Sequence, residues 1–200
     1  PMTTAREERI VVLDFGSQYA QLIARRVREQ RVYAHILPCT APLDEIKALK
    51  PIGMILSGGP ANVYAENAPV ADPAIFQLGV PVLGICYGAQ FMCQSLGGNV
   101  HRAESREFGH ADISVTGQSA LFDGLPMEMP VWMSHGDQVE RLPEGFHTLA
   151  KTGTCPHAAL ADETRKFYGV QFHPEVAHTP RGKEVLRNFL YNACGAKGEW

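Results

Sequence analysis

Short apolar runs alternate with longer stretches of helical spacing through the first half of the chain. The apolar runs are bounded by glycine, proline or polar residues, and they predict strands at 10–14, 32–37, 52–56 and 80–85. Apolar residues recurring every three or four positions predict helices at 18–29, 43–49, 71–78 and 86–96. Strands that are apolar throughout and separated by helices are typical of a parallel sheet covered on both faces.

The pattern changes near residue 100. Runs of strand character follow one another without a long helix between them, at 111–115, 130–133, 139–142, 148–150, 158–161 and 167–170. A last helix is predicted at 181–193, after Thr179-Pro180 and before Gly195. We therefore expect one α/β domain over residues 1–200. It should be a three-layer sandwich with a mostly parallel central sheet, helices on both faces and an antiparallel extension.

Composition narrows the class of protein. The net charge is −3 and the 18 basic residues are scattered, which argues against a nucleic-acid-binding face. No apolar run approaches the roughly 18 residues that a membrane span needs, so we expect no membrane association. The five cysteines form no C-x-x-C pair and have no histidine at zinc-finger spacing. These features favour a reduced, cytoplasmic compartment and predict no metal site.

Cys86 is the first candidate for chemistry. It lies where an apolar strand passes directly into a helix, with Gly84 two residues before it and Gly88 two residues after it. This spacing is that of a nucleophile elbow, with cysteine in place of serine. The start of a helix also favours a thiolate over a thiol. A buried structural cysteine is the alternative, and it is our interpretation of the other four: Cys39, Cys93, Cys155 and Cys194.

A thiol nucleophile needs a base and a group that orients the base. His173 follows an apolar strand, and Glu175 stands two residues on, so that in an extended chain both side chains point to one side. The sequence therefore predicts a Cys86–His173–Glu175 triad. His135 and Asp137 show the same spacing after another strand, and they are the rival pair.

Acyl transfer also needs N–H donors for the developing oxyanion. Ser57-Gly58-Gly59-Pro60 follows the third strand, which a parallel sheet would place beside the fourth. We expect one donor to be the Gly59 N–H and the other to be the Tyr87 N–H. The alternative is a plain turn, since such clusters usually only end a strand. A phosphate cradle is disfavoured because no Gly-Lys-Ser/Thr follows.

The segments 84–90 and 172–175 resemble the nucleophile and base signatures of the class I (triad-type) glutamine amidotransferase family. The resemblance extends over about residues 10–193. It implies a flavodoxin-like fold, a γ-glutamyl thioester on Cys86, and the release of glutamate and ammonia. It also implies that the substrate glutamine is held by Gln90 and by the loop residues Ser134, His135, Gly136 and Asp137.

Further segments resemble one branch of this family, in which the ammonia passes to an ATP-pyrophosphatase (synthetase) domain; they are 13–19, 56–60, 106–109, 133–137 and 171–179. The chain stops at Trp200, where the synthetase part would begin, and contains no Ser-Gly-Gly-Val-Asp-Ser motif. We therefore expect an excised domain or a separate subunit that works with a synthetase partner. No cofactor is expected in this chain, and ATP and Mg²⁺ are expected only in that partner.

Other functions stay open at this point. The chain could be the glutaminase subunit of another amidotransferase, such as anthranilate or aminodeoxychorismate synthase. It could be a cysteine peptidase-like or DJ-1-like enzyme, although Gln90 and Glu175 speak against this. A non-catalytic partner domain that regulates a synthetase is a third class, disfavoured because Cys86 and His173 are both present.

Overall fold

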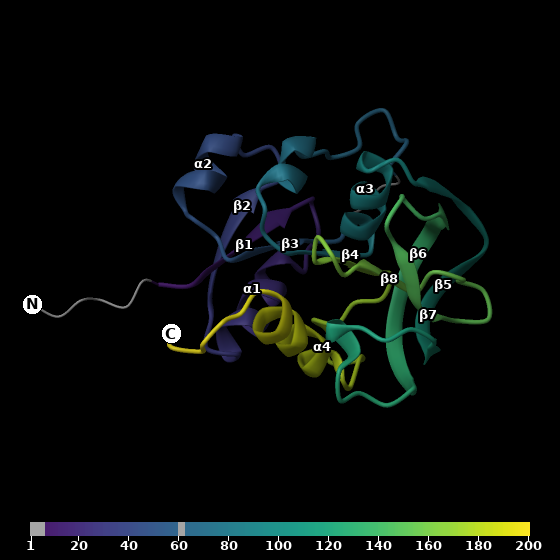
Figure 1. Ribbon diagram of the computed structural model, residues 1–200. Coiled ribbons are helices and arrows are strands. Elements are labelled where there is room, and N and C mark those ends of the chain that lie inside the picture. Colours follow the sequence, from purple (N-terminus) through teal and green to yellow (C-terminus); the bar gives the residue numbers. More distant parts are fainter. Residues whose placement is uncertain (1–6, 60–62) are drawn as a thin grey trace, which may run out of the picture.

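A single sheet of nine strands runs through the computed structural model, which describes residues 7–59 and 63–200 (Figure 1). The strand order is β2-β1-β3-β4-β9-β8-β7-β5-β6. The first five strands in this order are mutually parallel: β2 (Tyr33–Pro38), β1 (Arg9–Asp14), β3 (Gly53–Leu56), β4 (Val82–Ile85) and β9 (Phe167–Val170). The others continue the sheet with antiparallel pairing: β8 (Ala159–Asp162), β7 (His147–Lys151), β5 (Asn99–Val115) and β6 (Glu128–Arg141).

Helices cover both faces of the parallel half (Figure 1). α1 (Ala20–Glu29) and α4 (Gly182–Asn188) bury their apolar residues in one hydrophobic cluster. α2 (Leu43–Ala48) and α3 (Tyr87–Ser95) bury theirs in a second cluster. Neighbouring strand residues alternate between the two, with Val12 in the first and Val11 in the second, because successive side chains of a strand point to opposite faces. The predicted three-layer α/β sandwich with an antiparallel extension is confirmed.

Two predicted strands, at 130–133 and 139–142, are one continuous strand, β6. Its partner β5 is also longer than the predicted 111–115. The segment Ser134–Asp137, which the sequence indicates as a loop, therefore lies inside a strand. Cross-strand pairing explains the difference: Ser134 pairs with Phe108 and Asp137 with Arg102, and the register shift between Arg102 and Glu107 places the extra residues in β5.

Two helix predictions also need correction. The stretch 71–78 contains only a five-residue 3₁₀-helix, Pro73–Gln77, whose start is capped by the Asp72 side chain accepting from the Ala74 N–H. The predicted helix 181–193 is α4 followed by a π-helical turn, Phe189–Ala193, in which the Cys194 N–H reaches back to the Phe189 carbonyl. A further 3₁₀ turn is Ala120–Phe122. Within the described ranges, no helix has the length and apolar character to cross a membrane.

Candidate active site

Cys86 occupies a strained turn between β4 and α3. Its φ is +53° and its ψ is −110°, a conformation that L-residues rarely adopt. The Cys86 N–H donates to the Val170 carbonyl at 2.8 Å, so the turn is tied to the end of β9. This is the strand-to-helix turn that the sequence predicts, and it places the sulfur at the carboxyl edge of the sheet.

Glycine is required on both sides of this turn because α3 packs directly on the sheet. A Cβ at Gly84 would lie 2.7 Å from the main chain of Ala89, and a Cβ at Gly88 would overlap the main-chain carbonyl of Leu56. Real Cβ atoms do not approach so closely. The two glycines therefore let the helix start where the strand ends.

His173 lies three residues beyond β9, the strand that pairs with β4. Its N–H donates to the Trp132 carbonyl at 2.9 Å, and its own carbonyl accepts from the Thr179 hydroxyl at 2.7 Å. The same hydroxyl accepts from the Trp132 N–H at 2.9 Å. The position of His173 is thus set by contacts with β6 and with the turn before α4, as well as by its own strand.

Glu175 is the partner of the His173 ring. The His173 Nδ1 lies 3.2 Å from Oε1 and 3.4 Å from Oε2 of Glu175, whose side chain is fully buried. The two residues meet across a turn, because regular pairing in β9 ends at Val170. Arg26 of α1 donates to the Glu175 carbonyl at 3.0 Å and holds this turn against the helix. The pairing that the sequence predicts is present, although a turn and not an extended chain produces it.

The His173 ring and the Cys86 side chain both line the smaller cavity, and the Cys86 thiol donates to the Ser134 carbonyl at 3.4 Å. Burial alone would lower the pKa of His173, but the interactions of the ring with Cys86 and Glu175 outweigh burial and raise the pKa to about 10. The ring therefore carries its second proton at neutral pH. An imidazolium beside the sulfur stabilises a thiolate, the form in which cysteine acts as a nucleophile.

A cavity of about 690 Å³ opens in front of Cys86. Its lining includes every residue predicted to contact glutamine or the oxyanion: Gly59, Tyr87, Gln90, Ser134, His135, Gly136 and Asp137. A second cavity of about 300 Å³ lies on the His173 side and is also lined by Cys86. The structure therefore brings all the predicted site residues together around one sulfur atom, with space on both sides of it.

The Gly59 and Tyr87 N–H groups have no acceptor among the described residues. Tyr87 is the first residue of α3, where main-chain N–H groups lack a helical partner. Gly59 follows β3, the strand beside β4, as predicted. Both residues line the larger cavity next to the sulfur. Pro60, the last residue of the predicted Ser-Gly-Gly-Pro turn, lies outside the described residues.

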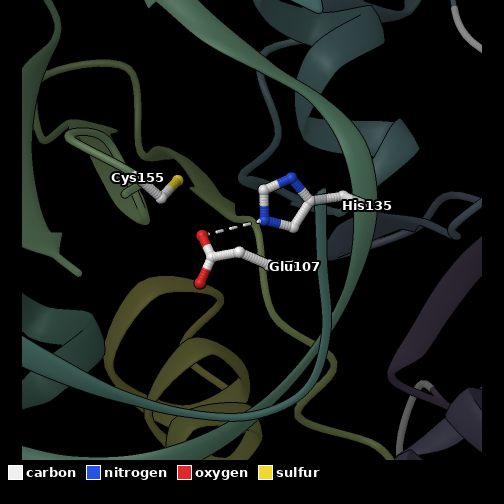
Figure 2. A group of neighbouring side chains, drawn as sticks. All are labelled: Glu107, His135 and Cys155. Carbon is white, nitrogen blue, oxygen red and sulfur yellow. Dashed lines mark ion pairs between the residues drawn. The ribbon is translucent and has the colours of Figure 1, made fainter. Parts of the chain in front are cut away.

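The rival pair, His135 and Asp137, makes a different contact from the one that its spacing suggests. The His135 Nδ1 lies 2.8 Å from the main-chain carbonyl of Asp137 and not from its carboxylate. A carbonyl only accepts, so Nδ1 carries the hydrogen. Burial lowers the pKa of His135, while the opposite nitrogen, Nε2, faces a Glu107 carboxylate oxygen at 3.5 Å (Figure 2). His135 therefore shapes the cavity wall and is not a second base for Cys86.

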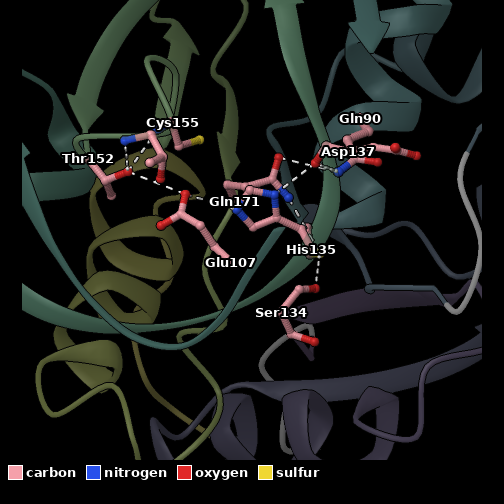
Figure 3. Close-up of polar contacts among 10 residues, drawn as sticks. Gln90, Glu107, Ser134, His135, Asp137, Thr152, Cys155 and Gln171 are labelled. Atoms are coloured by element: carbon pink, nitrogen blue, oxygen red, sulfur yellow. Dashed lines mark hydrogen bonds and ion pairs between the residues drawn. The ribbon is translucent and has the colours of Figure 1, made fainter. Parts of the chain in front are cut away.

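Gln171 is a site residue that the sequence did not single out. Its buried amide donates to the Cys86 sulfur at 3.5 Å. It also accepts from Gln90 at 3.3 Å (Figure 3). Gln90 also donates to the Asp137 carbonyl at 3.0 Å. The signal was available, because Gln171 stands two residues before His173 in a stretch otherwise apolar.

Four more cavity residues were missed because the β5 irregularity and a distant loop bring them in: Tyr64, Arg102, Arg106 and Phe108.

Comparison with known proteins gives relatives over almost the whole chain. "GMP synthase [glutamine-hydrolyzing]" of Heliobacterium modesticaldum is 56% identical over 193 residues, which are 96% of this chain and 38% of that protein. The protein of the same name from Listeria innocua is 56% identical over 194 residues, 97% of this chain and 38% of its own length. The chain thus spans less than two fifths of these curated relatives. These relatives belong to the GMP synthetase branch of the family, and this is the branch that the further segments of the sequence resemble.

Solved structures agree on the fold. A Thermoplasma acidophilum protein, provisionally named as one of the subunits of a GMP synthase, has a TM-score of 0.85 and 35% identity, covering 94% of each chain. A glutamine amidotransferase of Thermotoga maritima has a TM-score of 0.73 at 20% identity, covering 95% of this chain and 99% of its own, which shows the shared fold. Residues 11–193 match the family described as Glutamine amidotransferase class-I. The chain belongs to the class-I glutamine amidotransferase family.

Proposed function

We propose that this chain hydrolyses glutamine to glutamate and ammonia, as the ammonia-producing part of a GMP synthetase. The main support is the buried Cys86–His173–Glu175 arrangement beside a cavity lined by polar groups. The curated relatives, named as glutamine-hydrolysing GMP synthases, favour this branch over the other amidotransferases. Cys86 is proposed as the nucleophile, His173 as the proton carrier and Glu175 as the group that orients His173.

The reaction begins when the side-chain amide of glutamine enters the larger cavity. The Cys86 sulfur attacks the amide carbon, a C–S bond forms, and the carbonyl π electrons move onto oxygen. The N–H groups of Gly59 and Tyr87 would donate to this oxyanion. Neither N–H donates to another acceptor among the described residues, so both are free to do so. Donors that are already oriented stabilise the transition state more than the ground state.

The tetrahedral intermediate then loses ammonia. His173, which is protonated at neutral pH, donates its proton to the amide nitrogen as the C–N bond breaks, leaving a γ-glutamyl thioester and a neutral imidazole. The neutral ring next removes a proton from water as the oxygen attacks the thioester. Glutamate leaves, and the thiolate–imidazolium pair is restored. Glu175 keeps the ring in one orientation through both steps.

The charges of the cavity suit free glutamine, which is a zwitterion. Two basic residues, Arg102 and Arg106, line the cavity together with the acidic residue Asp137. An α-carboxylate would be attracted to the arginines and an α-ammonium group to the aspartate. A peptide-bound glutamine lacks both charges, so this lining favours the free amino acid.

Synthesis of GMP needs a second active site, and the matched part of each curated relative leaves more than half of that protein for it. We infer that an ATP-pyrophosphatase domain or subunit is the partner, and that it uses ATP and Mg²⁺ to activate xanthosine monophosphate. Ammonia from this chain would then displace AMP. No cofactor is assigned to this chain for the glutaminase step, because the chemistry requires only a thiol, a base and N–H donors.

The experiment that tests the proposal measures glutamate release from glutamine, with a glutamine-containing peptide as the comparison substrate. Wild-type turnover of glutamine that Cys86→Ala abolishes would support it. GMP formation is then measured with the ATP-pyrophosphatase partner, ATP, Mg²⁺ and xanthosine monophosphate. Added ammonium chloride should restore GMP formation with Cys86→Ala, because only the ammonia source is lost. Peptide cleavage without glutamine turnover would reject the proposal.

A further inference from the structure

Three side chains from separate elements converge (Figure 2), and one of them, His135, lines the larger cavity. Glu107 comes from β5, His135 from β6 and Cys155 from the turn between β7 and β8. One nitrogen, one sulfur and one carboxylate oxygen, contributed by the three, all lie within 4.8 Å of one another. The His135 and Cys155 side chains are buried, while 14% of the Glu107 side chain remains exposed.

The His135 ring points an unsatisfied nitrogen into this cluster. Its Nδ1 carries the hydrogen that the Asp137 carbonyl accepts, so the Nε2 of a neutral ring has only a lone pair. That Nε2 is 3.5 Å from a Glu107 oxygen, makes no hydrogen bond of good geometry within the described part of the chain, and belongs to a side chain only 1% exposed. Two lone pairs facing each other in a buried place are unfavourable, and a cation between them removes the conflict.

The donor set indicates which cation fits. A histidine nitrogen, a cysteine sulfur and a carboxylate oxygen are the three ligand types that bind Zn²⁺ in proteins. A thiolate and a carboxylate together balance the charge of a divalent ion, which suits a buried position. Tetrahedral coordination needs metal–ligand distances of about 2.0–2.3 Å. The three donor atoms already lie within 4.8 Å of one another, so an ion between them would have to draw each one closer to reach such distances.

Thr152 holds two of the three ligand residues in place (Figure 3). Its hydroxyl donates to a Glu107 carboxylate oxygen at 3.4 Å and accepts from the Cys155 N–H at 2.9 Å. On the other side, the Asp137 carbonyl orients the His135 ring. Outer contacts of this kind, which fix the direction of each ligand, are a regular feature of metal sites.

We propose that Glu107, His135 and Cys155 form a binding site for a zinc-type divalent metal ion, which braces the cavity wall. The three ligands leave one tetrahedral position for water. The ion would fix the His135 ring, and the ring bonds to the same Asp137 carbonyl that accepts from Gln90. Metal binding is thereby linked to the wall that lines the glutamine cavity. Sequence analysis predicted no metal site because these residues are far apart in the chain and Cys155 was interpreted as structural.

Cobalt is the probe, because a Co²⁺–thiolate bond gives a charge-transfer band in the near ultraviolet. The full chain carrying Cys86→Ser is titrated with Co²⁺, so that the active-site thiol cannot contribute. We expect a band that saturates at one Co²⁺ per chain and is displaced by Zn²⁺. Adding Cys155→Ser should abolish it, and Glu107→Gln should weaken Co²⁺ binding at least about tenfold. Adding Cys39→Ser, another buried cysteine outside the cluster, should leave it unchanged.

Two results would overturn the proposal. One is the absence of stoichiometric Co²⁺ or Zn²⁺ binding by the Cys86→Ser chain, which alone rejects the site. An infrared carbonyl band of a protonated carboxyl that Glu107→Gln removes would then identify what lies there. In that case a proton, and not a metal, joins Glu107 to His135. The other is a cobalt band that survives both Cys155→Ser and Glu107→Gln. Circular dichroism of each variant shows whether it is folded. If Cys155→Ser does not fold, Glu107→Gln still tests the site.

Discussion

The main-chain N–H of Cys86 donates a 2.8 Å hydrogen bond to the carbonyl of Val170, the last residue of β9. This bond joins the turn that carries the sulfur to the strand that leads to His173. Because β4 and β9 are also paired along their length, Cys86 and His173, the two residues of the proposed catalytic pair, are held by the same part of the sheet. The relative placement of Cys86 and His173 therefore depends on this edge of the sheet.

Replacing Cys86 by alanine should reduce glutamine turnover by at least about 10³-fold, because no thioester can form. The fold should persist, since one small buried side chain replaces another of similar shape. Glutamate release measures the loss, and circular dichroism measures the fold. Turnover within tenfold of wild type would exclude Cys86 as the nucleophile.

The strained backbone of Cys86 gives a separate prediction about stability. Its φ of +53° disfavours any residue with a Cβ and is open to glycine. Cys86→Gly should therefore have a free energy of unfolding about 1 kcal/mol higher than Cys86→Ala. Both variants lack the thiol, so alanine is the matched control. Urea unfolding measures the difference, and a Cys86→Ala protein at least as stable would show that the turn is not strained.

The raised pKa of His173 predicts how Glu175→Gln behaves. Interactions with Cys86 and with Glu175 hold the pKa at about 10 against the effect of burial. A folded-state pKa above the unfolded value of about 6.5 means that the stabilising contribution is complete below that pH and is lost as the pH rises toward 10. Removing the Glu175 charge should lower the pKa of His173. The stabilising contribution of His173 would then be lost at a lower pH.

Nuclear magnetic resonance of the His173 ring tests the point directly. At pH 8 the wild-type ring should be doubly protonated, and the Glu175→Gln ring should titrate at a lower pH. Glutamine turnover should fall less in Glu175→Gln than in His173→Ala, because an orienting group is less essential than the proton carrier. A larger loss with Glu175→Gln would mean that the two roles are misassigned.

The parts of the site that depend on local sequence were predictable, and those that depend on pairing between distant strands were not. The Gly84–Gly88 spacing and the short His173–Glu175 interval specify local geometry, and both placements agree with the structure. The strand character of residues 134–137 was missed, since it arises from pairing with β5 across an irregular register. The Glu107–His135–Cys155 cluster was missed for the same reason, because three separate elements contribute to it.

The isolated chain should hydrolyse glutamine slowly, and addition of the proposed synthetase partner should raise the rate. Uncoupled hydrolysis would waste glutamine, so a glutaminase that serves a second site benefits from control by that site. The comparison is glutamate release with and without the ATP-pyrophosphatase partner, its nucleotide substrates and Mg²⁺. An unrelated protein at the same concentration is the control. Full activity of the chain alone, unchanged by the partner, would contradict this prediction.

Gln171 should act as a positioning residue for both the nucleophile and the substrate pocket. Its amide donates to the Cys86 sulfur at 3.5 Å and accepts from Gln90 at 3.3 Å, and 2% of the residue is exposed. Gln171→Ala removes both bonds and leaves the Gln90 amide with the Asp137 carbonyl as its one acceptor among the residues that the structure describes. We expect kcat to fall about tenfold and KM for glutamine to rise, because each lost hydrogen bond is worth about 1 kcal/mol.

Gln138→Ala is the matched control, since Gln138 is a buried glutamine on β6 whose side chain makes no hydrogen bond to Cys86 or Gln90 in the described part of the chain. It should cost stability without changing the ratio of kcat to KM beyond about twofold. A purely structural role for Gln171 would lower the fraction of active protein and leave KM unchanged. Active-site titration of Cys86 with a thiol-directed glutamine analogue counts the active molecules, so a lower kcat per titrated site separates positioning from partial unfolding.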